Sequence, residues 1–170
     1  MHPTAREFVA EAEARHGIRP EVESFDEGTK TAADAADAIG CDVAQIASSI
    51  VMVAEGRRGG GRPAVDATDG AVVVVVTSGA NHVDEDRVAE AVGADSARMA
   101  TPDEASEATG WSIGGVPPIC HANDVPVLFD TTLLDFDTVW TAAGTPDSVW
   151  PVDPDRLREM ADATPVQVSV

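Results

Sequence analysis

Residues 109–118 read Thr-Gly-Trp-Ser-Ile-Gly-Gly-Val-Pro-Pro, a composition suited to binding a carbonyl group. Glycine lets a backbone approach a ligand closely and adopt positive φ angles, here at Gly114 and Gly115. The prolines that follow, Pro117 and Pro118, restrict the adjoining backbone. Such a rigid loop can direct backbone N–H groups at a ligand carbonyl, as an oxyanion hole does. The alternative is a loop that only connects a helix to a strand.

Three aromatic or imidazole side chains lie near this loop or near a predicted helix start. His121 can orient a water or donate a hydrogen bond to a substrate, or it can be a partly buried structural histidine. Trp111 can stack on an adenine or belong to the core or its rim. His82 precedes a helix and is expected in solvent. Because the chain has neither a Ser-His-Asp order nor a nucleophile elbow, a side-chain nucleophile is not indicated.

The sequence predicts no structural metal and no cofactor. Cys41 and Cys120 are too few for a disulfide framework, and we expect both as reduced thiols in or near the core. Cys120 is followed by His121, but two adjacent ligands do not make a zinc site. Glycines 59–61 lack the Lys-Ser/Thr of a phosphate-binding loop and are expected in a long hairpin connection over residues 55–70.

The charge of the chain is unusual for its size. The formal net charge is -19 and the pI is about 4.2. Lys30 is the single lysine, and the other basic residues are arginines. Such self-repulsion opposes a compact state in dilute buffer and is screened at molar salt. We therefore expect a salt-rich cytoplasm, the alternative being an ordinary acidic protein. At molar salt counterion release contributes little to nucleic-acid binding, so net charge says little about an RNA partner.

The chain length and the pattern of elements indicate one α/β domain over residues 1–170, with a mixed sheet and flanking helices. No apolar run has the length of a membrane span, and no signal peptide is evident, so we expect a cytoplasmic protein without membrane association. Helices are predicted over 4–16, 31–40, 84–92, 101–110 and 153–163, with a helical turn over 42–47. Strands are predicted over 21–25, 49–54, 71–77, 97–100, 125–129, 138–142 and 148–152.

Four segments together resemble the YbaK/ProX-like (YbaK/EbsC) family of aminoacyl-tRNA deacylases. They are the Thr-Gly helix end and Gly-x-x-x-Pro loop at 109–118, Ala-Ala-Asp-Ala-Ile-Gly at 35–40, Gln-Ile-Ala-Ser-Ser-Ile-Val-Met at 45–52, and Val-Trp-Thr-Ala-Ala-Gly-Thr-Pro at 139–146. They occur in the family's order and span about residues 20–165. The resemblance implies an α/β fold with a mixed, strongly curved sheet and a pocket for the 3′ aminoacyl-adenosine end of tRNA, not for DNA.

The resemblance also implies site residues. The loop with Gly114 and Gly115 would hold the ester carbonyl, and the attacking group would be a water positioned by backbone and by the substrate's own ribose hydroxyl. Where the family carries a lysine, this sequence has Ser48, which is too short to reach as lysine does. Lys30 can substitute for it or be a solvated surface lysine. The expected substrate-binding set is completed by Ser49, Pro117, Pro118, His121 and Gly144.

Two functions are consistent with these residues. The first is trans-editing, the hydrolysis of the ester bond of mischarged aminoacyl-tRNA. The second is a non-catalytic module that binds an aminoacyl or nucleotide-like ligand and lost its activity with the lysine. Ser48 is the position that separates them, because restoring lysine there would revive only a protein that had lost activity.

Overall fold

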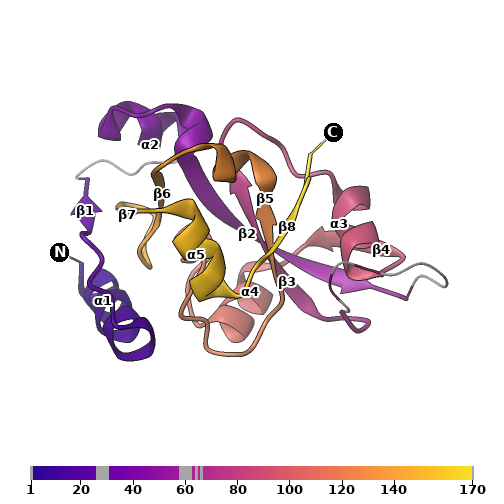
Figure 1. The fold of residues 1–170 in the computed structure, drawn as a ribbon. Coiled ribbons are helices and arrows are strands. Elements are labelled where there is room, and N and C mark those ends of the chain that lie inside the picture. Colours follow the sequence, from indigo (N-terminus) through magenta and orange to yellow (C-terminus); the bar gives the residue numbers. More distant parts are fainter. Residues whose placement is uncertain (1, 26–30, 58–62, 64, 66, 170) are drawn as a thin grey trace.

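The computed structural model describes residues 2–25, 31–57, 63, 65 and 67–169. It contains an open, mixed sheet flanked by helices (Figure 1), which confirms the predicted fold class. The helices are α1 (Pro3–His16), α2 (Ala32–Ile39), α3 (Glu85–Val92), α4 (Pro102–Thr109) and α5 (Pro154–Ala161), with 3-10 turns η1 (Val43–Gln45) and η2 (Thr131–Asp135). The strands are β1 (Glu23–Ser24), β2 (Ile46–Glu55), β3 (Val72–Ser78), β4 (Ser96–Met99), β5 (Val127–Asp130), β6 (Val139–Ala142), β7 (Ser148–Val152) and β8 (Thr164–Val166).

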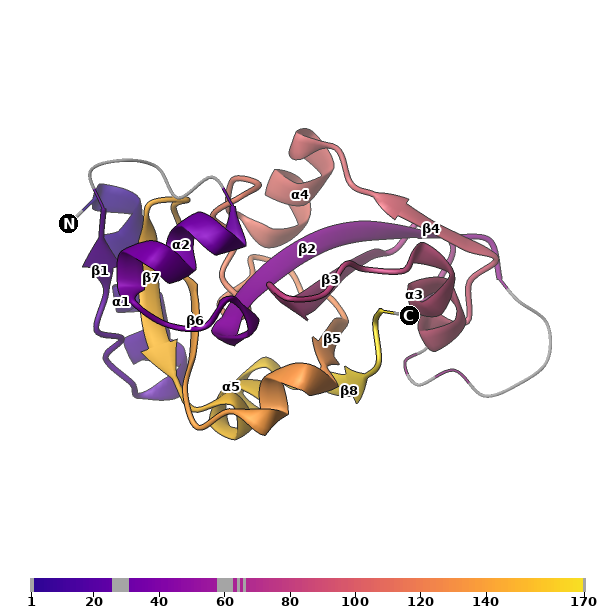
Figure 2. The same cartoon turned by 90° about the horizontal axis from the view of Figure 1, so that it is seen from above.

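The strands follow the order β1-β7-β6-β2-β3-β5-β8, and β4 pairs with β2 off this path. The pairs β2·β6, β3·β5 and β5·β8 are parallel, whereas β1·β7, β6·β7, β2·β3 and β2·β4 are antiparallel. In Figure 2 the long strand β2 curves from α2 at one end to β4 at the other. β2 therefore pairs with three strands, β3, β4 and β6.

Hydrophobic clusters pack on both faces of the sheet. Alternate valines of β3 divide between them: Val74 and Val76 join the cluster of Phe8, Trp111 and Trp150, while Val73 and Val75 join the cluster on α3. Successive side chains of a strand point to opposite faces, so a strand apolar at every position must be covered on both sides. This explains the unbroken run of valines at 72–76, within the strand predicted over 71–77.

Local sequence signals fixed most helix ends. The Thr31 side chain accepts a hydrogen bond from the Asp34 N–H at 3.1 Å, and Thr101 and Glu104 form a capping box, so both helices start where the sequence predicted. α1 begins one residue earlier than residue 4, the start predicted from the sequence. The helix begins at Pro3, and His2 is its N-cap, because Nδ1 of His2 accepts the Thr4 N–H at 3.1 Å and proline suits the first helical position.

Other elements also differ from the sequence prediction. β2 begins at Ile46 rather than at residue 49, because η1 ends at Gln45. α5 ends at Ala161, where Asp162 takes a left-handed conformation with φ 50°. The following β8 was missed because it is three residues long and contains Pro165, a residue that weakens a strand prediction.

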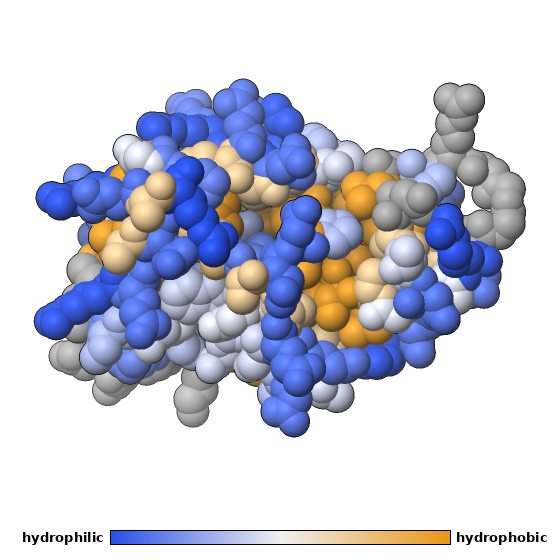
Figure 3. All heavy atoms as spheres, turned by 90° about the horizontal axis from the view of Figure 1, so that it is seen from below, coloured by the Kyte–Doolittle hydropathy of each residue, from blue (hydrophilic) through white to orange (hydrophobic). Residues whose placement is uncertain are grey.

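Within the described ranges no helix is long and apolar enough to cross a membrane. Figure 3 shows one face of the molecule, on which hydrophilic residues lie around a smaller apolar area.

Candidate active site

The site begins with an interruption in strand pairing along one edge of β2. β3 pairs with the other edge from Ala47 to Val53. On the first edge β6 pairs with Ile46 and Ala47, and β4 pairs with residues 52–55. Residues 48–51 therefore have no strand partner on this edge within the described chain. The Ala100 N–H donates to Val51 O at 3.0 Å, so the backbone groups of Val51 face this edge. Because the backbone groups of successive strand residues point to alternate edges, those of Ser49 face this edge as well.

A cavity of about 300 Å³ lies at this interruption. α2 contributes Thr31 and Ala35, and β2 contributes residues 46–51. The rest of the wall comes from the end of β4, the loop over residues 111–118, β6, β7 and the turn between these two strands. The lining residues from these segments are Met99, Ile113, Gly114, Val116, Trp140, Thr141, Ala142, Pro146 and Val149. Ser48, Ser49 and Gly114 thus lie around one cavity, although Gly114 is more than 60 residues from the two serines in the chain.

The loop over residues 111–118 forms neither helix nor strand, as the sequence predicted. Gly110 ends α4 in a left-handed conformation, and Gly114 has a φ of 90°. Gly114 lines the cavity, and its N–H has no acceptor among the described residues. Gly114 is exposed, so its unpaired N–H is available to water or to a ligand.

Gly115 has a different structural role from the one expected from the sequence. Its N–H donates to Ser112 O at 3.0 Å, and Gly115 is not among the residues that line the cavity. A Cβ at this position would lie 2.7 Å from Thr145 Cα and 2.9 Å from Gly144 O. Glycine is required here because two backbone segments touch, so the expectation of a second donor facing the cavity is corrected.

Hydrogen bonds on the far side of the loop hold it in place. His121 Nε2 lies 2.8 Å from Pro117 O, and since a carbonyl only accepts, Nε2 is the donor. Arg15 donates to His121 O at 2.9 Å. Burial lowers the pKa of His121, which favours its neutral form. His121 and Pro118 line another cavity, with Cys120 and Arg15, and Pro117 is buried. These three predicted substrate contacts are therefore not at the cavity of Ser48; they support its loop from behind.

Trp111 and Gly144 also help to hold the loop in place. The Trp111 side chain is buried, donates from Nε1 to Cys120 O at 2.9 Å, and meets the Phe8 ring edge-on at 6.1 Å between centroids. Gly144 has a φ of 98°, and a Cβ there would lie 2.9 Å from the Trp111 ring. Trp111 thus takes the core alternative left open by the sequence, and Gly144 is a close-packing position that is not among the residues lining the cavity of Ser48. His82 is exposed, as expected.

The two serines of β2 differ in their surroundings. By strand alternation Ser48 shares a face with Ile50, and Ser49 shares the opposite face with Ala47 and Val51. Ser49 Oγ is buried and has no hydrogen-bond partner. The hydroxyl of Thr141, by contrast, donates to Ala47 O at 2.8 Å.

The described wall of the cavity carries no ionisable side chain. Lys30 lies outside the described residues, although Thr31, its neighbour in sequence, lines the cavity. The structure also holds, among its described residues, no group of three His, Cys, Asp or Glu side chains that could bind a metal. The chemistry of the wall is thus that of backbone amides, hydroxyls and apolar groups.

The mouth of the cavity is apolar, a feature that the sequence did not reveal. Met99 is 52% exposed and Ile113 is 41% exposed, and they are the exposed large hydrophobic residues of the described chain. Both line this cavity. Met99 ends a short strand and Ile113 precedes the glycines, and neither position carries a signal in a single sequence that marks it as exposed.

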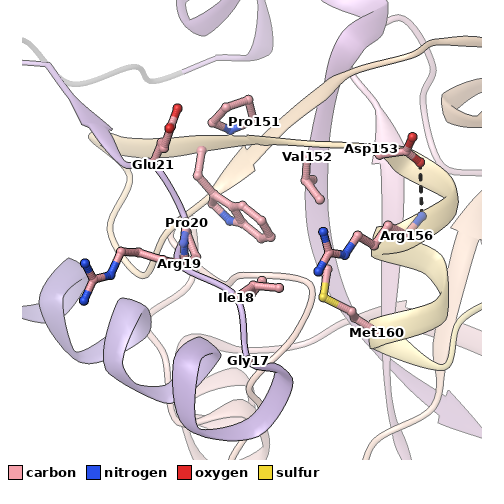
Figure 4. A pocket seen from close by; sticks show the side chains of 11 residues that line it. Gly17, Ile18, Arg19, Pro20, Glu21, Pro151, Val152, Asp153, Arg156 and Met160 are labelled. Atoms are coloured by element: carbon pink, nitrogen blue, oxygen red, sulfur yellow. Dashed lines mark hydrogen bonds between the residues drawn. The ribbon is translucent and has the colours of Figure 1, made fainter.

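A second cavity, of about 500 Å³, lies between the segment after α1 and the start of α5. Figure 4 shows Ile18, Val152, Arg156 and Met160 around it, with the Arg156 N–H bonded to the Asp153 carboxylate. None of the site residues predicted from the sequence lines it. Its Arg156 is exposed, so it has the character of a surface groove.

The fold and the first cavity define a class of protein: a mixed α/β domain with a neutral pocket between a glycine loop and an open strand edge. Residues 26–160 match the family model described as the aminoacyl-tRNA editing domain. The chain belongs to this family, which confirms the resemblance seen in its sequence.

Known proteins agree with this assignment. A solved structure proposed to be a trans-editing enzyme for prolyl tRNA synthetase is 32% identical with a TM-score of 0.86, covering 100% of this chain and 99% of that one. The uncharacterized protein YwhH of Bacillus subtilis is 31% identical over 83% of this chain and 81% of its own length. A proline--tRNA ligase of Acidithiobacillus ferrooxidans is 27% identical over 72% of this chain, which corresponds to 19% of the ligase.

Proposed function

We propose that this protein hydrolyses the ester bond of mischarged aminoacyl-tRNA, acting in trans and in the cytoplasm where that substrate is made. The observation that carries the proposal is Gly114, which lines the cavity beside the open edge of β2 and whose N–H has no acceptor in the described chain. Membership of the editing-domain family supplies the substrate class.

The reaction assigned to this site needs no side-chain nucleophile. A water attacks the ester carbonyl carbon, and the Gly114 N–H stabilises the negative charge that develops on the carbonyl oxygen. The bond from that carbon to the ribose oxygen then breaks, which releases the amino acid and leaves a hydroxyl on the terminal ribose. The proton of the attacking water passes to the ribose oxygen, aided by the neighbouring ribose hydroxyl.

The acceptor end of the tRNA would lie across the mouth of the cavity. A volume of about 300 Å³ admits the aminoacyl group but not the polynucleotide. Met99 and Ile113 at the mouth are suited to contact the apolar face of the terminal adenine. Since the chain carries a net charge of -19, contacts of this kind are better suited to the complex than phosphate contacts.

The direct test is a panel of mischarged tRNAs in molar potassium chloride. It begins with tRNA for proline, because one similar protein is a proline--tRNA ligase and another is a proposed trans-editing enzyme for prolyl tRNA synthetase. We expect release of the amino acid above the spontaneous rate for at least one tRNA. Gly114→Ala should reduce that rate, while Gly70→Ala, at a similar φ of 82° and with open space around it, should not. The absence of deacylation above the spontaneous rate for every tRNA would refute the proposal.

Ser48 favours a second candidate, a binding module without catalysis. It stands on β2 at the cavity, where the resembling family carries lysine. A wild-type protein that binds an aminoacyl-adenosine analogue but hydrolyses nothing, and is activated by Ser48→Lys, would establish this alternative.

A further inference from the structure

Two consecutive hydrogen bonds join α1 to the back of the loop over residues 111–118. The Arg15 guanidinium donates from Nη1 to His121 O at 2.9 Å, and His121 Nε2 donates to Pro117 O at 2.8 Å. Pro117 follows Gly114, the loop residue that lines the candidate active site, by three positions. A helix at the N-terminus is therefore connected to the segment that would bind the ester carbonyl.

Arg15 and His121 lie on the far side of the loop from the substrate cavity. Both line the cavity of about 410 Å³ that also contains Cys120 and Pro118. The described wall of the candidate active site includes neither of them. Any effect of these two side chains on a bound ester must therefore act through the position of the loop.

α1 also contacts the loop and its surroundings through apolar and backbone atoms. The Phe8 ring meets the Trp111 ring edge-on, and Thr4 O lies 3.2 Å from the position of a Cβ at Gly144. The editing-domain model matches residues 26–160, which excludes α1. The family match therefore assigns no role to this helix, although it packs directly behind the candidate site.

The backbone beside His121 adopts a conformation that is unusual for its residue type. Cys120 has a φ of 66°, in the left-handed region that residues other than glycine seldom occupy. Such a conformation persists where surrounding contacts determine it. Trp111 Nε1 donates to Cys120 O at 2.9 Å, and Arg15 binds the next carbonyl along the chain. The segment behind the loop is thus held by α1 as well as by the loop itself.

We infer that Arg15 and His121 are positioning residues, which hold the loop so that the Gly114 N–H meets the carbonyl oxygen as charge develops on it. This inference rests on the proposed hydrolysis. An oriented donor loses much of its effect when it is displaced by about 1 Å. Because neither side chain touches the substrate, its removal should lower kcat and leave KM unchanged.

The first experiment measures the first-order rate constant of deacylation in single turnovers with saturating enzyme, a quantity that does not depend on the folded fraction. Arg15→Ala should lower this constant by roughly 5- to 50-fold. Arg15→Lys should recover much of the loss, because one N–H makes the contact with His121 O and an ammonium can also donate there.

Glu11→Gln is the matched control for Arg15. Arg15 Nε pairs with the Glu11 carboxylate at 2.9 Å, on the exposed surface of α1, while the bond to His121 O uses Nη1. An exposed ion pair contributes little, so the rate constant of Glu11→Gln should stay within about twofold of wild type. A loss in this variant equal to that of Arg15→Ala would attribute the effect to the ion pair and overturn the inference.

The second experiment tests whether the two residues act through one series of contacts. His121→Leu removes the donor to Pro117 O and should lower the rate constant by a factor similar to that of Arg15→Ala, whereas His121→Gln keeps an N–H donor and should recover much of it. In the double variant Arg15→Ala/His121→Leu the loss should stay within about twofold of the larger single loss, because coupled residues are not additive.

Three results would overturn the inference. The first is a wild-type rate constant in both Arg15→Ala and His121→Leu. The second is a double variant in which the two losses multiply, as they do for independent sites. The third is a loss confined to KM, which would place these side chains in contact with the tRNA.

A protein that hydrolyses no mischarged tRNA refutes the proposed catalysis, and the position of the loop remains measurable by amide hydrogen exchange. The Gly115 N–H donates to Ser112 O at 3.0 Å within the loop. Arg15→Ala should accelerate exchange at Gly115 by at least about fivefold, because local opening then becomes easier, whereas Glu11→Gln should not. Equal exchange rates in wild type and Arg15→Ala would show that α1 does not hold the loop.

Discussion

Gly115→Ala should displace the glycine loop without touching the cavity directly. The added Cβ would lie 2.7 Å from Thr145 Cα, whereas ordinary contact begins at 3.4 Å, so the two segments must separate by about 0.7 Å (3.4 − 2.7). The nearest atoms are backbone atoms of residues 144 and 145, which cannot rotate away as the end of a side chain can. Strain from overpacking of this kind costs about 1–3 kcal/mol.

Thermal unfolding and single-turnover deacylation measure the two consequences separately. For a chain of this length the strain corresponds to a fall in melting temperature of about 2–12 °C. A displacement approaching 1 Å at the neighbouring Gly114 should reduce the rate by roughly 10- to 100-fold, because catalysis by oriented groups is sensitive to position.

Gly17→Ala is the matched control, because Gly17 has open space around it and lies outside the glycine loop. Its positive φ costs stability, but the variant should retain the wild-type deacylation rate. A Gly115→Ala protein with wild-type melting temperature and rate would show that the close contact between residues 115 and 145 is not needed, and would refute this explanation of the glycine.

Other predictions test separate features. The melting temperature of wild type should rise steeply between about 0.1 and 2 M potassium chloride, because the Debye length falls from about 10 Å to below 3 Å and the repulsion among a net charge of -19 is screened; a flat profile would remove the salt-adaptation argument. Between about pH 7.5 and pH 5.5 the melting temperature of wild type should fall relative to that of His121→Gln, since the folded pKa of His121 is lowered by burial from 6.5, so that protonation on acidification favours the unfolded chain; parallel pH profiles would contradict this. Met99→Ser should raise KM for aminoacyl-tRNA several-fold with little change in kcat if the exposed methionine contacts the terminal adenine, and an unchanged KM would place the nucleotide elsewhere.

Local signals predicted those parts of the fold that depend on neighbouring residues. The caps of α2 and α4 and the valine run of β3 follow from interactions within a few residues or from a two-residue period. β8 and the N-cap at His2 were missed. β8 is a strand because residues 128–130 lie beside it, and pairing between distant segments leaves no trace in a three-residue sequence.

The candidate site also has features that the sequence could predict and features that depend on contacts between distant segments. Motif order was sufficient to bring Ser48, Ser49 and Gly114 to one cavity. It could not distinguish the front of the loop from its back, so His121 and Pro118 were expected at the cavity although they lie behind it. Likewise, a glycine that frees a backbone N–H and a glycine that allows two backbones to touch are identical in sequence, which is why Gly114 and Gly115 were assigned one role.

The described wall of the cavity carries no charged side chain, so adaptation of the surface charge and adaptation of the pocket can proceed independently. Substitutions that change the charge of the outer surface act mainly through long-range fields, which salt screens, and they need not alter a pocket built from amides, hydroxyls and alkyl groups. Such a protein can be moved between dilute and concentrated electrolytes by replacing surface residues alone. The described wall has no group that titrates near neutrality, so in the proposed reaction the α-amino group of the aminoacyl ester is the group whose ionisation would change with pH in the pocket.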